Sequence, residues 1–162
     1  MKIFFDTEFT GLSSEPRLIS VGMVAANGLE LYVELSDGWS ESQCSTWVQE
    51  NVLPQLGSVP PLCRRDAATE ILRWLSSFET TPVLLADSDW DTELLGSLLD
   101  ASSNTKLGDN IGRVGFESKL QWLLFERVRQ EYFLSNGLQP HHALTDARVL
   151  CHAYGAVRKH AE

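Results

Sequence analysis

An unbroken apolar run meets two acids at the start of this chain, in MKIFFDTEF. Three consecutive apolar residues before an acid predict a strand that is buried on both faces of a sheet. Residues two apart on a strand point to the same side, so Asp6 and Glu8 are expected to project from one face. Two carboxylates about 4 Å apart repel by about 4 kcal/mol at an effective dielectric constant near 20. Both stay ionised only if a cation lies between them, and otherwise one of them takes up a proton.

The alternative is that the strand ends at Phe5 and that both acids lie in a solvated turn. Further acid clusters elsewhere in the chain decide between these two interpretations, because a shared cation site needs ligands from more than one segment.

The rest of the chain predicts one mixed α/β domain over residues 1–162, with strands first and helices alternating later. Two strand-like segments between Leu18 and Leu35 are joined by Asn27-Gly28, a strong hairpin signal. The first three strands are therefore expected to be sequential and antiparallel. The other expected elements are a short helix near Trp47 that Pro54 breaks, a helix from the N-cap Asp66 to Phe78, a buried strand at 82–87, helices over 91–100, 117–134 and 143–160, and a loop over 101–113.

Composition narrows the functional classes. The net charge of −9 argues against a protein that grips nucleic acid through a broad basic surface, although acids gathered at one place can bind cations. No apolar run approaches the roughly 20 residues that cross a bilayer, and acids at positions 6 and 8 interrupt any signal-peptide core. Three cysteines without metal-like spacing indicate reduced thiols. We therefore expect a cytoplasmic protein without membrane contact.

A second acid cluster, VLLADSDWDTELL, leaves a buried strand and enters an apolar helix through Asp87, Asp89 and Asp91. An EF-hand loop that began at Asp87 would require glycine at its sixth position, where Thr92 stands. Helix capping alone can account for one of these acids.

A third cluster, QPHHALTDARVL, places His141 five residues before Asp146. On one continuous helix these two side chains would diverge by about 140°. They can serve one site only if His141 precedes the helix or lies on its first turn, and Pro140 favours that arrangement. Asp146 would then lie in the first turn, where the helix dipole favours an anion.

Together, FFDTEFTGL, SDWD and HHALTDA resemble the three exonuclease motifs of the DEDDh superfamily, in the same order. The short chain and its hairpin are similar to the small Rv2179c-like exoribonuclease branch. The resemblance implies a ribonuclease H-like fold, a mixed β-sheet flanked by α-helices. It also implies that Asp6, Glu8, Asp91 and Asp146 hold two divalent ions, Mg²⁺ or Mn²⁺, and that His141 is the general base.

The same resemblance implies the substrate contacts. Phe9, Thr10 and Gly11 would lie beside the terminal nucleotide, with Phe9 available for base stacking. The substrate would be single-stranded or 3′-overhang RNA or DNA, shortened from its 3′ end to nucleoside 5′-monophosphates. The choice between RNA and DNA stays open, and so does a homodimer, because many relatives are dimers.

Three departures from the family pattern bear on substrate choice. Phe9 stands where threonine is usual, Asp87 where asparagine is frequent, and His142 where arginine is frequent. The change at Asp87 adds negative charge near a phosphate, and the change at His142 removes a cation. Arg148, two residues after Asp146, is the best single candidate for a phosphate contact. Trp74, Trp122 and Phe125 lie at helical spacing among aliphatic residues and are expected in the core.

Two other functions fit parts of the sequence. FFDTEFT also resembles the opening of haloacid-dehalogenase phosphatases, which requires a second aspartate where this chain has Glu8 and leaves HHALTDA unexplained. A non-catalytic nucleic-acid-binding module would have no need of mutually repelling carboxylates.

Overall fold

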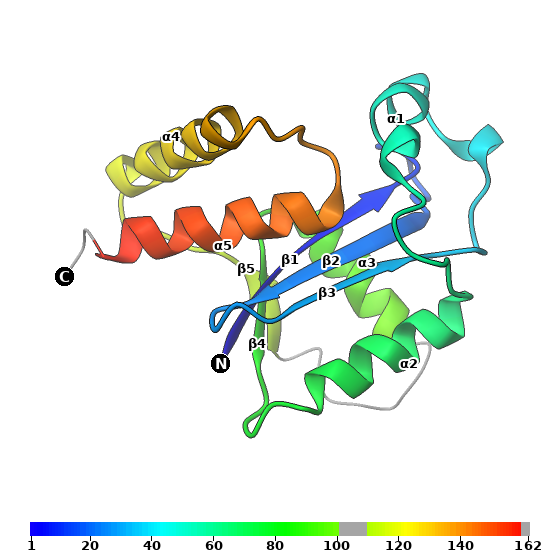
Figure 1. Ribbon diagram of the computed structural model, residues 1–162, viewed down its shortest axis with the longest axis horizontal. Helices are drawn as coiled ribbons and strands as arrows, with labels where there is room; N and C mark the ends of the chain where they lie inside the picture. Colours follow the sequence, from blue (N-terminus) through cyan, green and yellow to red (C-terminus); the bar gives the residue numbers. More distant parts are fainter. Residues whose placement is uncertain (101–109, 160–162) are drawn as a thin grey trace.

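Five strands form one mixed sheet in the computed structural model, which describes residues 1–100 and 110–159. Their order across the sheet is β3-β2-β1-β4-β5 (Figure 1). β2 is antiparallel to both β1 and β3, whereas β4 is parallel to β1 and to β5. The strands are β1 (Lys2–Phe9), β2 (Leu18–Ala25), β3 (Glu30–Glu34), β4 (Val83–Ala86) and β5 (Ile111–Arg113). The helices are α1 (Thr46–Asn51), α2 (Arg64–Leu75), α3 (Asp89–Asp100), α4 (Lys119–Asn136) and α5 (Ala143–Lys159), with a 3-10 turn, η2 (Leu53–Gln55), after α1.

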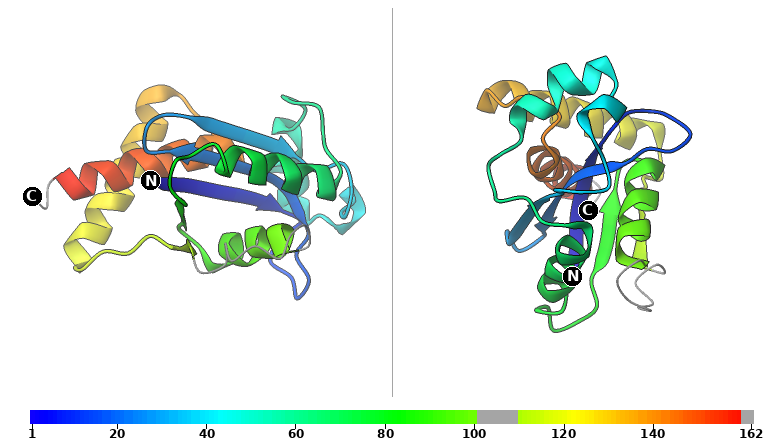
Figure 2. Two further views of the ribbon diagram at one scale, coloured as in Figure 1. Left: turned by 90° about the horizontal axis from the view of Figure 1, so that it is seen from below. Right: turned by 90° about the vertical axis from the view of Figure 1, so that its right-hand side faces the viewer.

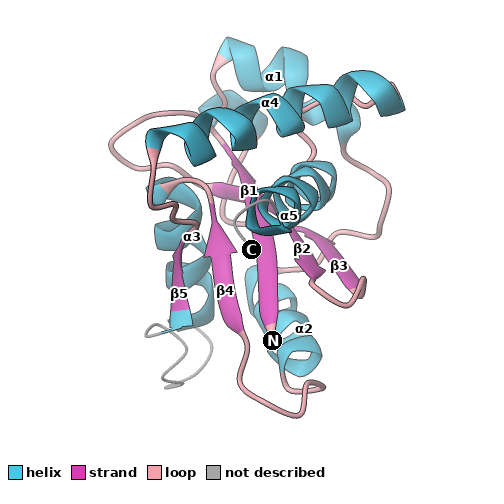
Figure 3. Ribbon diagram, turned by 90° about the vertical axis from the view of Figure 1, so that its left-hand side faces the viewer, coloured by secondary structure: helices cyan, strands magenta, loops and turns pink. Residues whose placement is uncertain are grey.

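Helices cover both faces of the sheet. α2 and α3 pack on one face, and α4 and α5 pack on the other (Figure 2 and Figure 3). Along β1, Ile3 and Phe5 belong to the core beneath α2 and α3, whereas Phe4 belongs to the core beneath α4 and α5. The predicted strand with two buried faces is therefore confirmed, and it continues to Phe9 rather than ending at Phe5. By the alternation of a strand, Asp6 and Glu8 lie on the same side as Phe4 and face α5.

The start of α5 lies directly against β2 at Gly22. A Cβ atom on this glycine would lie 2.2 Å from the backbone nitrogen of Leu144 and 2.3 Å from the carbonyl carbon of Ala143. Gly22 is also the register partner of Asp6 on the neighbouring strand. The missing side chain therefore lets the first turn of α5 approach the acid end of β1.

Most of the predicted elements are confirmed. The hairpin turns at Asn27-Gly28, and Gly28 has a φ of 90° that suits glycine. α4 begins with a capping box at Ser118 and ends at Gly137, whose left-handed φ of 60° is the predicted C-cap. Phe125 is fully buried, and Trp74 and Trp122 pack against the two cores as expected.

Two expectations are wrong. α2 begins at Arg64 after the N-cap Cys63, so Asp66 lies in the first turn rather than at the cap. The loop expected over 101–113 ends in strand β5, while residues 101–109 lie outside the described part of the chain. A strand of three residues is too short to show an alternating pattern in the sequence.

Within residues 1–100 and 110–159, every helix is too short or too polar to span a bilayer.

Candidate active site

A cavity of about 620 Å³ lies at the carboxyl end of β1, between the start of α3 and the start of α5. Five acids line it: Asp6, Glu8, Asp87, Asp91 and Asp146. The remaining lining residues are Thr7, Phe9, Gly11, Leu12, Ser45, Trp47, Val48, Ser88, Arg129 and His141. Acids from three segments far apart in the sequence therefore meet at one place, as the three motifs predict.

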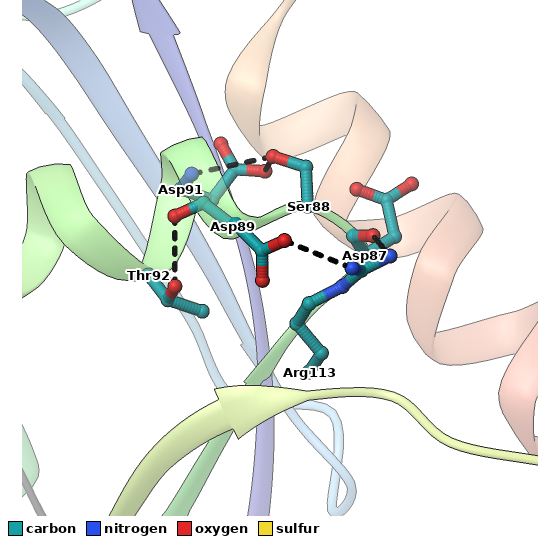
Figure 4. A network of polar contacts seen from close by, with 6 residues as sticks. All are labelled: Asp87, Ser88, Asp89, Asp91, Thr92 and Arg113. Carbon is teal, nitrogen blue, oxygen red and sulfur yellow. Dashed lines mark hydrogen bonds and ion pairs between the residues drawn. The ribbon is translucent and has the colours of Figure 1, made fainter.

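Asp91 is held firmly at the start of α3. Its Oδ1 accepts hydrogen bonds from the backbone N–H of Thr7 at 3.0 Å and from the Thr7 hydroxyl at 2.6 Å. Its Oδ2 accepts a hydrogen bond of 2.6 Å from the Ser88 hydroxyl (Figure 4). The two Thr7 donors tie the second motif to β1 near its carboxyl end.

Asp89, two residues earlier, makes a different set of contacts. It pairs with Arg113 of β5 (Figure 4). The two atoms are 3.1 Å apart, and the Asp89 side chain is 72% exposed. Asp89 is not among the residues that line the cavity.

His141 precedes α5 and is fixed there through its backbone. Its φ of 71° is left-handed, a conformation that costs free energy for a residue other than glycine. The His141 N–H donates to Asp146 Oδ2 at 2.8 Å. The Gln55 amide of η2 donates to the carbonyl oxygens of Pro140 and His141, each at 2.9 Å. The Trp47 ring meets the imidazole edge-on, with ring centres 4.5 Å apart.

Burial and mutual repulsion raise the pKa values of the cavity acids. Burial raises the pKa of Asp6 well above its usual range, and the nearby carboxylates of Asp91 and Asp146 raise it further. For the same reasons the pKa of Glu8 rises to about 8. Burial raises the pKa of Asp146 to about 7, against the lowering effects of the His141 N–H and the Arg129 guanidinium.

The pKa values of Asp91 and His141 shift for the same main cause, which is burial. Burial raises the pKa of Asp91, although the donors Ser88 and Thr7 partly oppose the shift. Burial lowers the pKa of His141, which favours the neutral imidazole. The cavity therefore holds carboxylates that protein groups compensate poorly, next to a histidine that can accept a proton.

These acids fit divalent cations. Ligand atoms of Glu8, His141 and Asp146 lie within 4.8 Å of one another, and so do those of Asp6, Asp87 and Asp91. Asp146 Oδ1 is buried and has no hydrogen-bond partner in the described part of the chain. A buried carboxylate oxygen without a partner is costly. Oxygen ligands of this type suit Mg²⁺ and Mn²⁺.

The three expected substrate contacts differ in position. Phe9 and Gly11 line the cavity, and the Phe9 ring lies 6.2 Å from that of Trp90. Thr10 is buried and does not line it. Its hydroxyl accepts the N–H of Arg17 at 3.0 Å, and its own N–H donates to the Arg17 carbonyl at 3.0 Å. Thr10 therefore closes the loop that carries Gly11.

Two further residues take positions that the sequence did not indicate. Arg148, the expected phosphate contact, makes two hydrogen bonds with Glu30, at 2.8 and 2.6 Å, and does not line the cavity. His142 stacks on Tyr32 with ring centres 4.5 Å apart.

Arg129 of α4 lines the cavity and pairs with Asp87 at 2.6 Å. Sequence reasoning missed it because α4 carries no motif, and no local signal brings position 129 close to position 87. Trp47, expected only as part of a short helix, was missed as a cavity residue for the same reason.

The fold has a counterpart among solved structures. This chain shares its fold with the nuclease domain of 3'hExo, a DEDDh family member solved in complex with rAMP. The superposition has a TM-score of 0.57 at 13% identity and covers 98% of this chain and 90% of that chain. The predicted ribonuclease H-like fold, a mixed sheet between helices, is therefore confirmed.

Particular relatives appear in the sequence comparison. Two 3'-5' exoribonucleases of Mycobacterium tuberculosis, MT2234.1 of strain CDC 1551 and Rv2179c of strain H37Rv, are each 39% identical to this chain over 56 residues. The match covers 35% of this chain and 33% of each relative, so the chain spans about a third of the length of the curated relatives it matches. No protein-family model matches the chain. Fold and partial match together confirm the resemblance to DEDDh-type exonucleases of the Rv2179c-like kind.

Proposed function

We propose that this protein is a metal-dependent 3′–5′ exonuclease that hydrolyses phosphodiester bonds of RNA or DNA and releases nucleoside 5′-monophosphates. The observation that carries the proposal is the cluster of four acids from β1, α3 and α5 beside His141, with one buried oxygen left unpaired among the described residues. The partial match to two 3'-5' exoribonucleases and the fold shared with a DEDDh nuclease domain support it.

In this proposal Asp6, Glu8, Asp91 and Asp146 hold two Mg²⁺ or Mn²⁺ ions. Bound ions of this kind activate a water and stabilise the charge that develops on the leaving 3′ oxygen. Thr7 and Ser88 orient the Asp91 carboxylate, and the His141 N–H orients that of Asp146. These two carboxylates are therefore fixed in direction before any ligand binds.

His141 is the general base of the proposal. Its lowered pKa keeps the imidazole neutral near pH 7, and the neutral form can take the proton of the attacking water. Phe9, Trp47 and Leu12 supply apolar surface on the same cavity, where a terminal base can stack. Gly11 lines the cavity as well, and Thr10 acts indirectly by holding the loop.

The substrate of the proposal is a single-stranded or 3′-overhang chain, with RNA favoured by the partial relatives. We place the protein in the cytoplasm, and a homodimer is compatible with the family resemblance.

A direct test incubates the protein and Mn²⁺ with 5′-labelled single-stranded RNA, the matching DNA and a generic phosphate monoester. Stepwise shortening from the 3′ end, abolished by EDTA, is the expected result. Cleavage of the monoester alone would support a phosphatase instead. Retention of the oligonucleotide without cleavage would support a binding module.

Asp91 and Asp89 provide a matched pair of variants for this assay. Asp91→Asn should lower kcat by at least about 100-fold, on the scale of losing one preorganised catalytic group. Asp89→Asn removes an exposed ion pair with Arg113, worth about 0–1 kcal/mol, and should retain activity. Full activity of Asp91→Asn would refute the site assignment.

A further inference from the structure

Five acids and one permanently charged basic side chain line the cavity, as far as the described residues go. The chain itself carries a net charge of −9. A nucleic-acid substrate brings further negative charge into this cavity, and the fifth acid, Asp87, is not among the four proposed metal ligands. The basic residue is Arg129. An inference about its role rests on the proposed function and on the contacts that its side chain makes.

Arg129 is held at the cavity from three directions. Its Nη1 lies 2.6 Å from Asp87 Oδ2 and 3.5 Å from Glu126 Oε1. Its guanidinium lies over the ring of Phe125, 5.5 Å from the ring centre, and that ring is fully buried. Its side chain is 24% exposed and that of Asp87 is 21% exposed. The pair is therefore partly shielded from water, where an ion pair is screened less than at the surface.

The Arg129 guanidinium has N–H donors besides those that face Asp87 and Glu126. Both recorded ion-pair contacts use Nη1, so within the described residues Nη2 and Nε remain available to donate. A guanidinium can bind a carboxylate along one side and a phosphate along another, because its five N–H groups form a planar fork. The fork therefore has N–H groups left with which to bind an anion while Nη1 stays paired with Asp87.

Asp87 and Arg129 also explain a departure from the family pattern. The extra negative charge at Asp87 does not face the substrate uncompensated, since Arg129 neutralises it. His142 stacks on Tyr32 and does not line the cavity, whereas Arg129 of α4 brings a cation to it.

We propose that Arg129 binds a phosphate of the nucleic-acid substrate, and that Asp87 is the positioning residue that holds its guanidinium at the cavity. This assigns to α4, which carries no exonuclease motif, a substrate-binding role in the site.

The test measures equilibrium binding of a fluorescent single-stranded oligonucleotide over a series of salt concentrations, with Mg²⁺ present. All proteins carry His141→Ala, so that the proposed base is absent and turnover does not obscure binding. Arg129→Ala should weaken binding about 10-fold and reduce the slope of log Kd against log salt by about 0.7, the contribution of one phosphate contact on a single strand. Arg129→Lys should keep most of the slope but not the full affinity, because it keeps the charge and loses the fork.

Arg127→Ala is the matched control. Arg127 lies on the same helix, is exposed, and pairs with Glu131, four residues later. Its removal should leave affinity and slope unchanged. If Arg129→Ala binds with the affinity and the slope of Arg127→Ala, the proposal is overturned, provided that both variants keep the melting temperature of the parent to within a few degrees.

A double-mutant cycle tests the positioning role of Asp87. Asp87→Asn should weaken binding about threefold when Arg129 is present, because the guanidinium loses its anchor. In the Arg129→Ala background the same substitution should strengthen binding, because it only removes negative charge. An equal effect in both backgrounds would show that Asp87 does not act through Arg129.

Cleavage by the protein with His141 intact, scored separately, keeps this proposal distinct from the function. Shortening of the oligonucleotide without the Arg129 effect would overturn the phosphate contact alone. Binding that depends on Arg129 without any shortening would overturn the exonuclease function alone. Absence of both binding and cleavage would overturn both.

Discussion

At the scale of single residues, the geometry of the site depends on the absence of a side chain at Gly22. Gly22 provides the surface on which the first turn of α5 rests, and it stands opposite Asp6 in the sheet. A Cβ atom at this position would approach within 2.2–2.4 Å of backbone atoms of Ala143 and Leu144, which cannot rotate away. The distance between Asp146 and β1 is therefore set by the absence of a side chain on β2.

Gly22→Ala should destabilise the protein by about 1–3 kcal/mol or more, the range for overpacking a tight contact. It should also lower nuclease activity, because α5 must move away from Asp6. Urea denaturation gives the stability, and the oligonucleotide assay gives the activity.

Gly155→Ala is the control on α5 itself. A Cβ at Gly155 meets no atom within 4 Å, and its backbone is helical. Alanine there should raise stability by about 0.5–1 kcal/mol, because it favours the helix. Equal stability changes of both variants would contradict the close approach at Gly22.

The sequence predicted the acids that line the cavity, but not the residues that position these acids and the histidine. Asp6, Glu8, Asp91 and Asp146 lie in short motifs whose spacing carries their chemistry. Gly22, Gln55 and Arg129 act through contacts between distant segments, and such contacts leave no local pattern. At Arg148, by contrast, a local signal was misleading. Its proximity in sequence to Asp146 suggested a phosphate contact, but its guanidinium hydrogen-bonds to Glu30 instead.

At the scale of elements, the loop before α5 is tied to η2 rather than to its own helix alone. Gln55 of η2 donates to two consecutive carbonyl oxygens, those of Pro140 and His141. These bonds hold a residue with a left-handed backbone, which would otherwise relax to a less strained conformation. The position of the imidazole is therefore maintained by a short turn far away in the sequence.

Gln55→Ala should lower kcat about 5- to 10-fold with little change in KM. Losing hydrogen bonds worth about 1 kcal/mol each frees the loop and misplaces His141, but it leaves the acids in place. Steady-state kinetics on a labelled oligonucleotide separates the two constants.

Asn136→Ala serves as its control, because this amide donates to the carbonyl of Tyr132 at the exposed end of α4. Unchanged kinetics are expected. A change in KM alone for Gln55→Ala would argue against a role in positioning the base.

Prediction of elements succeeded where a pattern extends over several residues. The hairpin at Asn27-Gly28 and the ends of α4 follow from turn and cap residues that act locally. The start of α2 was misplaced, since Asp66 suits either an N-cap or the first turn of a helix. β5 escaped detection because its three residues are defined by pairing with β4 and not by their own periodicity.

At the scale of the whole molecule, the buried acids link stability to pH and to metal. The pKa values of Glu8 and Asp146, about 8 and about 7, lie above the 4.5 and 3.8 usual for these acids. The folded protein therefore binds protons more tightly than the unfolded chain. The tighter binding of protons contributes to the stability of the folded protein. This stabilisation is complete below about pH 4 and is lost as the pH rises through 7 and 8.

In EDTA, the melting temperature should therefore fall as the pH rises from about 5 to about 8.5. Added Mg²⁺ or Mn²⁺ should raise it again, and by more at higher pH, because ionised carboxylates bind the cations and protons compete with them. Thermal denaturation with and without the ion, at several pH values, gives both curves.

The double variant Glu8→Gln, Asp146→Asn should show a flatter pH curve in EDTA and a smaller response to the ion. A melting temperature that rises steadily over the same pH range without metal would contradict the raised pKa values.

The separation of the acids along the chain has a consequence for biosynthesis. Asp6 and Glu8 leave the ribosome well before His141 and Asp146, which belong to the segment around the start of α5. A growing chain that stops before this segment lacks one of its four clustered carboxylates and the base. The proposed nuclease site is therefore incomplete until the segment around the start of α5 has been translated, and the ribosome-bound chain before that point has no complete site with which to cut RNA.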